Sequence, residues 1–134
     1  MIEITNKELI EKAASIVRAR NNGDFTVGDV GCALITDKGN LYLGVCIDTS
    51  SGMGFCAEHN AIGSMTTAGE SKIKKIVAVS KNKNDAYILS PCGRCREFMR
   101  QIDDDNLETR VILSENKEIT LKELLPYYAW YNKI

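Results

Sequence analysis

The chain has 134 residues with a formal net charge of −1 at pH 7, 44% hydrophobic residues and 26% charged residues. A chain of this length can bury about two thirds of its unfolded surface, so we expect a single domain over residues 1–134 that needs no disulfide bonds. Because the charges nearly balance, they do not favour a stable nucleic-acid partner, and a small-molecule substrate is the better expectation.

The N-terminal stretch predicts an amphipathic helix. Apolar residues recur at helical spacing over 9–17, and Thr5 or Asn6 can cap the first turn. The Asn-Asn-Gly-Asp sequence at 21–24 should end this helix, because Gly and Asn tolerate the left-handed conformation that closes helices. A loop that carries Phe25 then follows.

The central part predicts strands around a second helix. Apolar runs at 30–35 and 41–47, joined by the turn sequence Asp-Lys-Gly-Asn, indicate a β-hairpin of two buried strands. A helix should begin at Cys56 and reach about residue 68, and the amides and dipole at its N-terminus should lower the pKa of Cys56. A third strand is predicted over 73–79.

A third helix is predicted after this strand. Proline suits the first turn of a helix, so Pro91 should open it, and Cys92 and Cys95 can then face the same side. The Asp-Asp-Asp-Asn run at 103–106 should stop the helix as a solvated turn, because it lacks the ligand pattern of a calcium loop.

The C-terminal part predicts a strand over 110–114, a tight connection over 115–118, a short strand or helix entry over 119–121, and a short helix ended by Pro126. The connection between the strands is too short for a parallel crossover, so they should be antiparallel. An aromatic tail could pack on the body, cover a neighbouring subunit or line the substrate pocket. It consists of Tyr127, Tyr128, Trp130 and Tyr131.

The N-terminal residues carry no basic leader with a long apolar run, and no stretch is long enough to span a bilayer, so we expect a cytoplasmic protein without a membrane partner.

The cysteines favour a metal site over disulfide bonds. The cysteine count is five, an odd number, and in a reducing compartment such residues more often bind metal.

Cys56, Cys92 and Cys95 are the right number and type of ligand to hold one Zn²⁺ and leave a fourth position for water. Glu58 follows Cys56 by two residues and can reach that water, where a carboxylate moves protons between water and substrate. The remaining cysteines, Cys32 and Cys46, are interpreted as buried strand residues.

The two segments, Cys56-Ala57-Glu58 and Pro91-Cys92-Gly93-Arg94-Cys95, resemble the signature of the cytidine deaminase superfamily. The cysteine at the first ligand position is similar to the branch that acts on free nucleosides, and so is the predicted antiparallel return. The resemblance implies a three-layer α/β/α fold with a mixed five-stranded sheet. It also implies one zinc ion per subunit and a homo-oligomer, a tetramer, whose active sites form across subunits.

The reaction implied is hydrolytic deamination of a cytosine nucleoside, cytidine or deoxycytidine, with release of ammonia, as in pyrimidine salvage. Water activated by the metal would attack C4 of the ring while Glu58 supplies and relays protons. Three thiolates leave the zinc site with a charge of about −1, so a positive neighbour is expected. Candidates are His59, Arg94 and Arg96, although His59 could equally be a structural histidine.

The same resemblance implies substrate contacts from Cys46, Asp48, Ala57 and Phe25. The family usually carries an Asn-x-Glu pattern that binds ribose where this chain reads Cys46-Ile47-Asp48, so Asp48 would retain only part of the sugar contact. The segment 91–96 and the Glu-Leu-Leu-Pro sequence before the aromatic tail are similar to blasticidin S deaminase. Blasticidin S, or a related cytosine nucleoside antibiotic, is therefore the alternative substrate.

Other functions are open from the residues alone. Cys56-x-x-His59 with Cys92-x-x-Cys95 also satisfies a closed Cys₃His site, which would be structural and without catalysis. Cys92-Gly93-Arg94-Cys95 has the form of a thiol–disulfide enzyme, but this leaves Cys56 and Glu58 unexplained. The acidic balance and the short C-terminal connection disfavour an editor of RNA or DNA.

Overall fold

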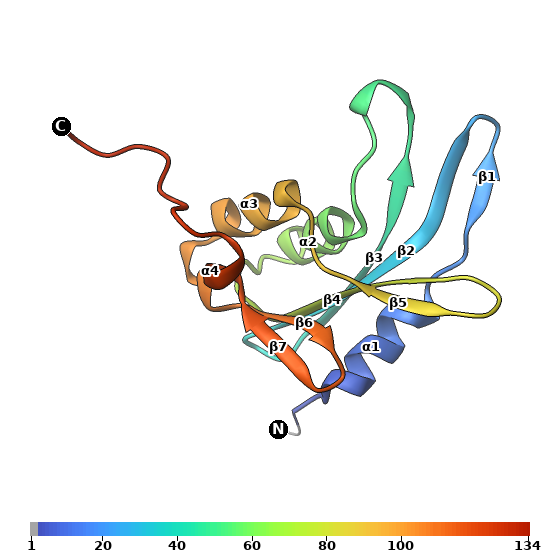
Figure 1. The fold of residues 1–134 in the computed structure, drawn as a ribbon, viewed down its shortest axis with the longest axis horizontal. Helices are drawn as coiled ribbons and strands as arrows, with labels where there is room; N and C mark the ends of the chain where they lie inside the picture. The colour runs from blue at the N-terminus through green and yellow to red at the C-terminus, as the bar shows by residue number, and fades with distance from the viewer. Residues whose placement is uncertain (1–2) are drawn as a thin grey trace.

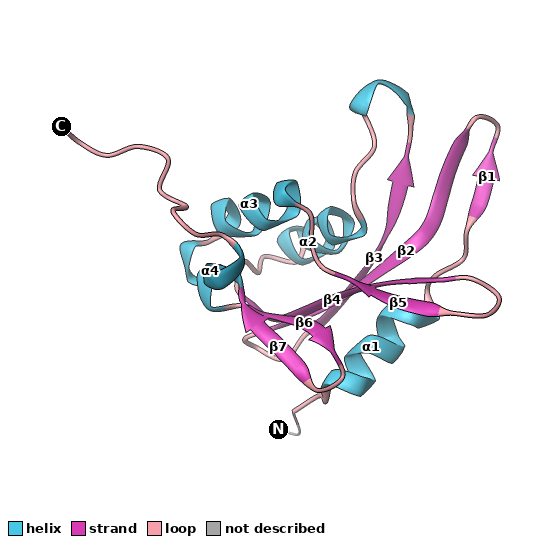
Figure 2. Ribbon diagram, viewed as in Figure 1, coloured by secondary structure: helices cyan, strands magenta, loops and turns pink. Residues whose placement is uncertain are grey.

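The computed structural model describes residues 3–134, which form a twisted sheet with helices on both faces (Figures 1 and 2). The helices are α1 (Asn6–Ser15), α2 (Ala57–Thr67), α3 (Gly93–Ile102) and α4 (Leu121–Leu124). The strands are β1 (Arg20–Asn22), β2 (Phe25–Thr36), β3 (Leu41–Asp48), β4 (Ile73–Lys81), β5 (Ala86–Leu89), β6 (Arg110–Ser114) and β7 (Lys117–Thr120). Two 3₁₀ turns, Ser50–Gly52 and Asp104–Glu108, complete the elements of the described residues.

The sheet is five positions wide, in the order β3, β2, β4, β6, β7. Strands β1 and β4 pair with the same edge of β2, at different places along it. In the same way, β5 and β6 pair with the same edge of β4. The described residues therefore form seven strands, whereas five were predicted. Strands β4 and β6 are parallel and the other pairs are antiparallel, including β6 and β7. The sheet is therefore mixed, as expected.

Alternation along β2 produces the three layers. Cys32 and Leu34 pack with residues of α2 and α3 on one face, whereas Ala33 packs with Leu9 and Ala13 of α1 on the other. Figure 1 shows α1 on the opposite side of the sheet from α2 and α3. The predicted α/β/α architecture and the buried position of Cys32 are both confirmed.

A glycine allows α2 to lie directly on the sheet. A Cβ atom at Gly44 of β3 would lie 2.3 Å from the backbone nitrogen of Ala61, so a larger residue would push α2 away. The Asn60 side chain also donates a hydrogen bond to the Val45 carbonyl at 3.1 Å. These contacts hold the first turn of α2, and Cys56 before it, against the hairpin.

The N-terminal prediction was only partly right. Thr5 caps α1, but the helix ends at Ser15 and a strand, β1, takes the place of its expected last turn. Gly23 and Asp24 form a hairpin turn in which Gly23 has φ of 65°, so Phe25 begins β2 instead of lying in a loop. Pairing with β2 outweighs the helical periodicity here.

Two predictions around α3 need correction. The helix begins at Gly93 with Cys92 as its N-cap, so Pro91 precedes the helix instead of opening it. Asn106 is not in a solvated turn, because its side chain is fully buried. Its amide accepts a hydrogen bond from the Ile73 amide and donates to the carbonyls of Ser71 and Met99 at 2.8, 3.0 and 2.9 Å.

The chain after α4 leaves the body of the molecule (Figure 1). Tyr127, Trp130 and Tyr131 are largely exposed, so this aromatic tail does not line the site in the single chain. Among residues 3–134, no helix combines the length and the apolar character that a bilayer crossing requires.

Candidate metal centre and substrate pocket

Three thiols from two helix N-termini meet on one face of the sheet. Cys56 is the N-cap of α2, Cys92 is the N-cap of α3, and Cys95 lies in the first turn of α3. The Sγ atom of Cys92 is 3.7 Å from that of Cys56 and 3.6 Å from that of Cys95. A tetrahedral zinc ion with Zn–S bonds of about 2.3 Å separates its sulfur ligands by about 3.8 Å. The donor set and its spacing therefore fit zinc.

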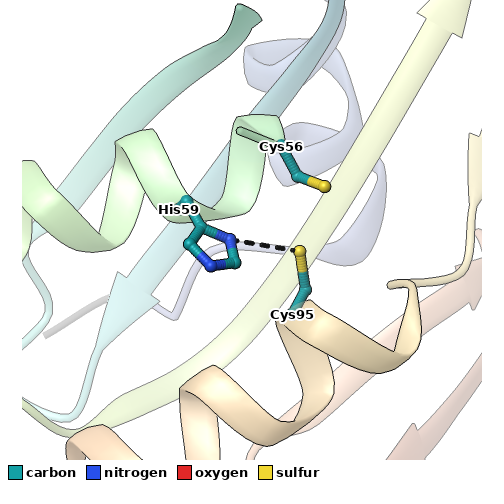
Figure 3. Close-up of side chains that lie close together, drawn as sticks. All are labelled: Cys56, His59 and Cys95. Carbon is teal, nitrogen blue, oxygen red and sulfur yellow. Dashed lines mark hydrogen bonds between the residues drawn. The ribbon is translucent and has the colours of Figure 1, made fainter. Parts of the chain in front are cut away.

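His59 lies beside this cluster, in the first turn of α2 (Figure 3). Its Nδ1 atom is 3.4 Å from the Cys95 sulfur, and its ring stacks on Phe98 with centroids 4.1 Å apart. The donor atoms of Cys56, His59 and Cys95 all lie within 4.8 Å of one another. Distance alone thus leaves His59 in reach of the metal position.

The protein environment acts differently on the three thiols. Burial raises the pKa of Cys56 and holds that of Cys95 well above its ordinary value. At Cys92, burial also acts to raise the pKa, but the backbone N–H groups of Cys95 and Arg94 and the neighbouring thiols leave it lowered. The expectation of a lowered pKa at Cys56 was wrong, because desolvation outweighs the helix terminus there. A bound dication would replace the protons of these thiols.

Glu58 is buried beside the cluster, with 6% of its surface exposed. Burial raises the pKa of its carboxyl group above the ordinary value, and the backbone N–H of Glu58 and the Cys95 thiol partly oppose this shift. The position follows from α2, whose first turn carries Glu58 directly behind Cys56. A buried carboxyl group next to a metal position is suited to exchange protons with a bound substrate.

A pocket of about 420 Å³ opens over the cluster. Its walls include Cys56, Glu58 and Cys92, together with Ala57, Cys46 and Asp48 from the predicted substrate contacts. Neither His59 nor Cys95 belongs to this lining. The fourth predicted contact, Phe25, lies at the start of β2 with 41% of its surface exposed and is also outside the lining.

Arg94 is the cation of the pocket wall among the described residues. Its guanidinium donates a hydrogen bond to the Gly54 carbonyl at 3.4 Å. Burial and the positive charge of Arg94 both lower the pKa of His59, which favours a neutral imidazole. Arg96 is engaged elsewhere, because it donates to the carbonyls of Pro91 and Leu124 at 2.8 and 3.0 Å. Of the three candidates, the geometry favours Arg94 as the positive neighbour of the thiolates.

The sequence reasoning missed Asp29. Its carboxylate accepts a hydrogen bond from the Cys46 thiol, and both residues line the pocket. Val27 pairs with Ile47 and Gly31 with Val45, so three residues, 28–30, oppose Cys46 alone. This bulge turns Asp29 into the pocket. The signal in the sequence was Gly28, which has φ of 79° and interrupts an apolar strand.

Comparisons with known proteins find a matching family model and similar sequences and folds. The family model described as the cytidine and deoxycytidylate deaminase zinc-binding region matches residues 4–110. Cytidine deaminase of Mycoplasma genitalium is 31% identical over 125 residues, which cover 90% of this chain and 92% of that protein. Blasticidin-S deaminase of Bacillus cereus is 34% identical over 106 residues, which cover 72% and 74%. The crystal structure of cytidine deaminase from Burkholderia pseudomallei matches with a TM-score of 0.72 and 26% identity, and covers 92% of this chain and 98% of that one.

Proposed function

Because the chain belongs to the cytidine and deoxycytidylate deaminase zinc-binding family, we propose that it removes ammonia hydrolytically from a cytosine nucleoside, cytidine or deoxycytidine. One observation carries this proposal. Cys56, Cys92 and the buried carboxyl group of Glu58 line one pocket, and the thiol of Cys95 lies directly behind that wall, 3.6 Å from the Cys92 sulfur. A metal site of this kind next to a proton-transfer group is the requirement of the reaction.

We propose that Cys56, Cys92 and Cys95 hold the zinc ion. When bound, zinc supplies a Lewis acid that lowers the pKa of a water molecule toward neutrality. Glu58 accepts a proton as that water adds to C4 of the ring and delivers it to N3. Glu58 then takes the proton of the hydroxyl group on C4 and passes it to the exocyclic amino group, so that the C4–N bond breaks, ammonia leaves and the uracil carbonyl forms. Glu58 can alternate between these states because it is no ligand of the metal.

The other polar groups bind, orient and balance charge. The Arg94 guanidinium offsets the negative charge that three thiolates leave on a dication. Asp48 and Ala57 line the same pocket as the thiols and are proposed as contacts of the sugar and the base. His59 is proposed as a neutral packing partner of Phe98 that leaves the fourth metal position to water.

Further properties of the enzyme are proposed from its free cysteines and its exposed aromatic residues. We propose a single domain with one zinc ion per subunit, active in the cytoplasm in pyrimidine salvage, where the five free cysteines suit a reducing compartment. Self-association as a homotetramer would cover the exposed aromatic residues Tyr127, Trp130 and Tyr131. It would also offer Phe25, exposed at the start of β2, to a neighbouring site. The mass of the protein in solution tests this state.

A second substrate is supported by a specific likeness. The chain is 34% identical to blasticidin-S deaminase of Bacillus cereus over 106 residues. The pocket also lacks the asparagine of the Asn-x-Glu pattern and presents Cys46 at that position. Blasticidin S or a related cytosine nucleoside antibiotic is therefore the alternative substrate.

The test is ammonia release from purified protein of measured zinc content, given cytidine, deoxycytidine and blasticidin S in parallel. Glu58→Gln serves as the blank. Turnover of cytidine or deoxycytidine would support the first proposal, and turnover of the antibiotic alone would support the second. Zinc-loaded protein that releases ammonia from none of the three would overturn both.

A further inference from the structure

The bulge in β2 forms part of the pocket wall. Residues 28–30 oppose the single residue Cys46, and Gly28 permits the turn through its φ of 79°. A Cβ atom at Gly28 would lie 2.3 Å from the Arg18 carbonyl oxygen, so other residues would displace this backbone. The arrangement holds Asp29 at one place on the pocket wall.

Cys46 secures the Asp29 carboxylate. Burial and the hydrogen bond to the neighbouring Asp29 carboxylate together raise the pKa of the Cys46 thiol to about 11, so the thiol keeps its proton at neutral pH. It donates that proton to Asp29, which has no Lys, Arg or His partner within 4.0 Å among residues 3–134. The Asp29, Cys46 and Asp48 donor atoms lie within 4.8 Å of one another.

The chemistry of the ring decides which part of a substrate meets these carboxylates. C4 must face the thiols and Glu58, and N1, which carries the sugar, lies on the opposite side of the pyrimidine ring. The sugar therefore extends away from the metal ligands, toward the rest of the pocket lining. Asp29 and Asp48 belong to that lining, and Arg94, in the first turn of α3 between Cys92 and Cys95, is its one cation among the described residues.

We infer that Asp29 is a specificity-determining residue, which together with Asp48 accepts the hydroxyl groups of a free nucleoside and rejects the 5′-phosphate of a nucleotide. The inference rests on the proposed function and narrows its substrate class. A phosphate monoester carries a charge of about −1.5 to −2 at pH 7, so two carboxylates on the sugar side repel it. The same carboxylates are good acceptors for hydroxyl donors. The family model spans cytidine and deoxycytidylate deaminases, and this wall selects the nucleoside.

The experiment compares cytidine with cytidine 5′-monophosphate as substrates of the zinc-loaded wild type, Asp29→Asn and Asp24→Asn. Asp29→Asn removes the charge and keeps an acceptor for the Cys46 thiol. Asp24→Asn makes the same charge change at an exposed position outside the pocket lining. We expect the wild type to favour the nucleoside in kcat/KM by at least roughly a hundredfold. Asp29→Asn should reduce this ratio roughly tenfold, and Asp24→Asn should leave it unchanged.

Binding and salt dependence separate repulsion from a structural effect. The dissociation constants of cytidine and cytidine 5′-monophosphate are measured for the zinc-loaded Glu58→Gln protein, with and without the additional Asp29→Asn substitution. The preference for cytidine in binding should fall by the same factor as the preference in kcat/KM. Raising the salt concentration should reduce the preference for cytidine over its monophosphate more in the wild type than in Asp29→Asn. Should Asp29→Asn fail to fold, Asp48→Asn changes an exposed side chain and should shift the ratio in the same direction.

The outcomes are distinct. If cytidine is bound and deaminated but Asp29→Asn leaves the ratio unchanged, the inference is wrong and the proposed function stands. If the wild type uses the monophosphate as well as the nucleoside, Arg94 binds the phosphate and the inference is overturned. If the wild type neither binds nor deaminates either ligand, the proposed function fails, and the inference fails with it.

Discussion

The sulfur atoms of Cys56 and Cys92 lie 3.7 Å apart although 36 positions separate the residues in the chain. Each is the N-cap of a helix, and both helices cover the same face of the sheet. Two helix N-termini that meet in this way bring together thiols, amide dipoles and the first-turn carboxyl group of Glu58. The catalytic proposal depends on this meeting point, and it can be tested residue by residue.

Replacement of a ligand thiol should remove the metal. Cys92→Ser leaves two thiols at the site, so zinc content after dialysis should fall from about one per chain to less than about 0.2, and turnover should disappear. Cys46→Ser is the matched control, because its thiol belongs to the Asp29 group and not to the metal cluster. A Cys92→Ser protein that keeps its full zinc content would contradict the assignment.

Glu58→Gln should separate metal binding from catalysis. Glutamine matches the shape of glutamate but cannot exchange protons, so zinc content should stay unchanged while kcat falls by at least about a thousandfold. The measurement is ammonia release together with metal analysis of the same preparation. Loss of zinc in this variant would instead make Glu58 a metal ligand.

His59→Ala should keep both zinc and most of the activity if the fourth position belongs to water. Loss of the stacked contact with Phe98 should lower the unfolding free energy by about 1 kcal/mol. Phe98→Leu is the control, because it removes the same stacking without removing a nitrogen donor. If His59→Ala loses its metal and Phe98→Leu does not, the site is a closed Cys₃His module and the catalytic proposal is wrong.

Asn106→Ala should destabilise the fold without touching the pocket. The variant leaves the buried amide of Ile73 and the carbonyls of Ser71 and Met99 without the partners that Asn106 supplies. The expected loss in unfolding free energy is about 3 kcal/mol. Chemical denaturation measures it, and zinc content of the folded fraction should not change. Asp104→Ala, in the exposed part of the same turn, should change stability by less than about 0.5 kcal/mol.

Stability should fall in acid partly through Glu70. The Tyr42 hydroxyl donates to its carboxylate at 2.6 Å, which holds the pKa of Glu70 below its ordinary value. A carboxyl group whose pKa is lower in the folded than in the unfolded state stabilises the fold at pH values above its unfolded pKa. This contribution disappears as the pH falls through the folded pKa. Glu70→Gln should therefore lose less stability than the wild type between about pH 5 and pH 3. Equal losses in both proteins would assign the acid sensitivity to other groups.

The sequence predicted the parts of the molecule that depend on short spacing. Cys56 and Glu58 share one helix turn, and Cys92 and Cys95 share another, so their chemistry can be interpreted before the fold is known. The buried hairpin and the antiparallel return of β7 on β6 also follow from local patterns. Within single elements, the prediction needed no information about distant residues.

The parts that sequence reasoning missed depend on pairing between distant segments. Residues 20–22 become a strand because β2 offers them an edge, and Asn106 is buried because the turn before β4 packs on it. Asp29 enters the pocket through a bulge whose register depends on β3. A propensity or a periodicity describes a residue and its close neighbours, whereas register and burial come from contacts that only the assembled sheet provides. The proposed metal ligands could thus be identified from the sequence alone, whereas the position of Asp29 in the pocket wall became visible only in the fold.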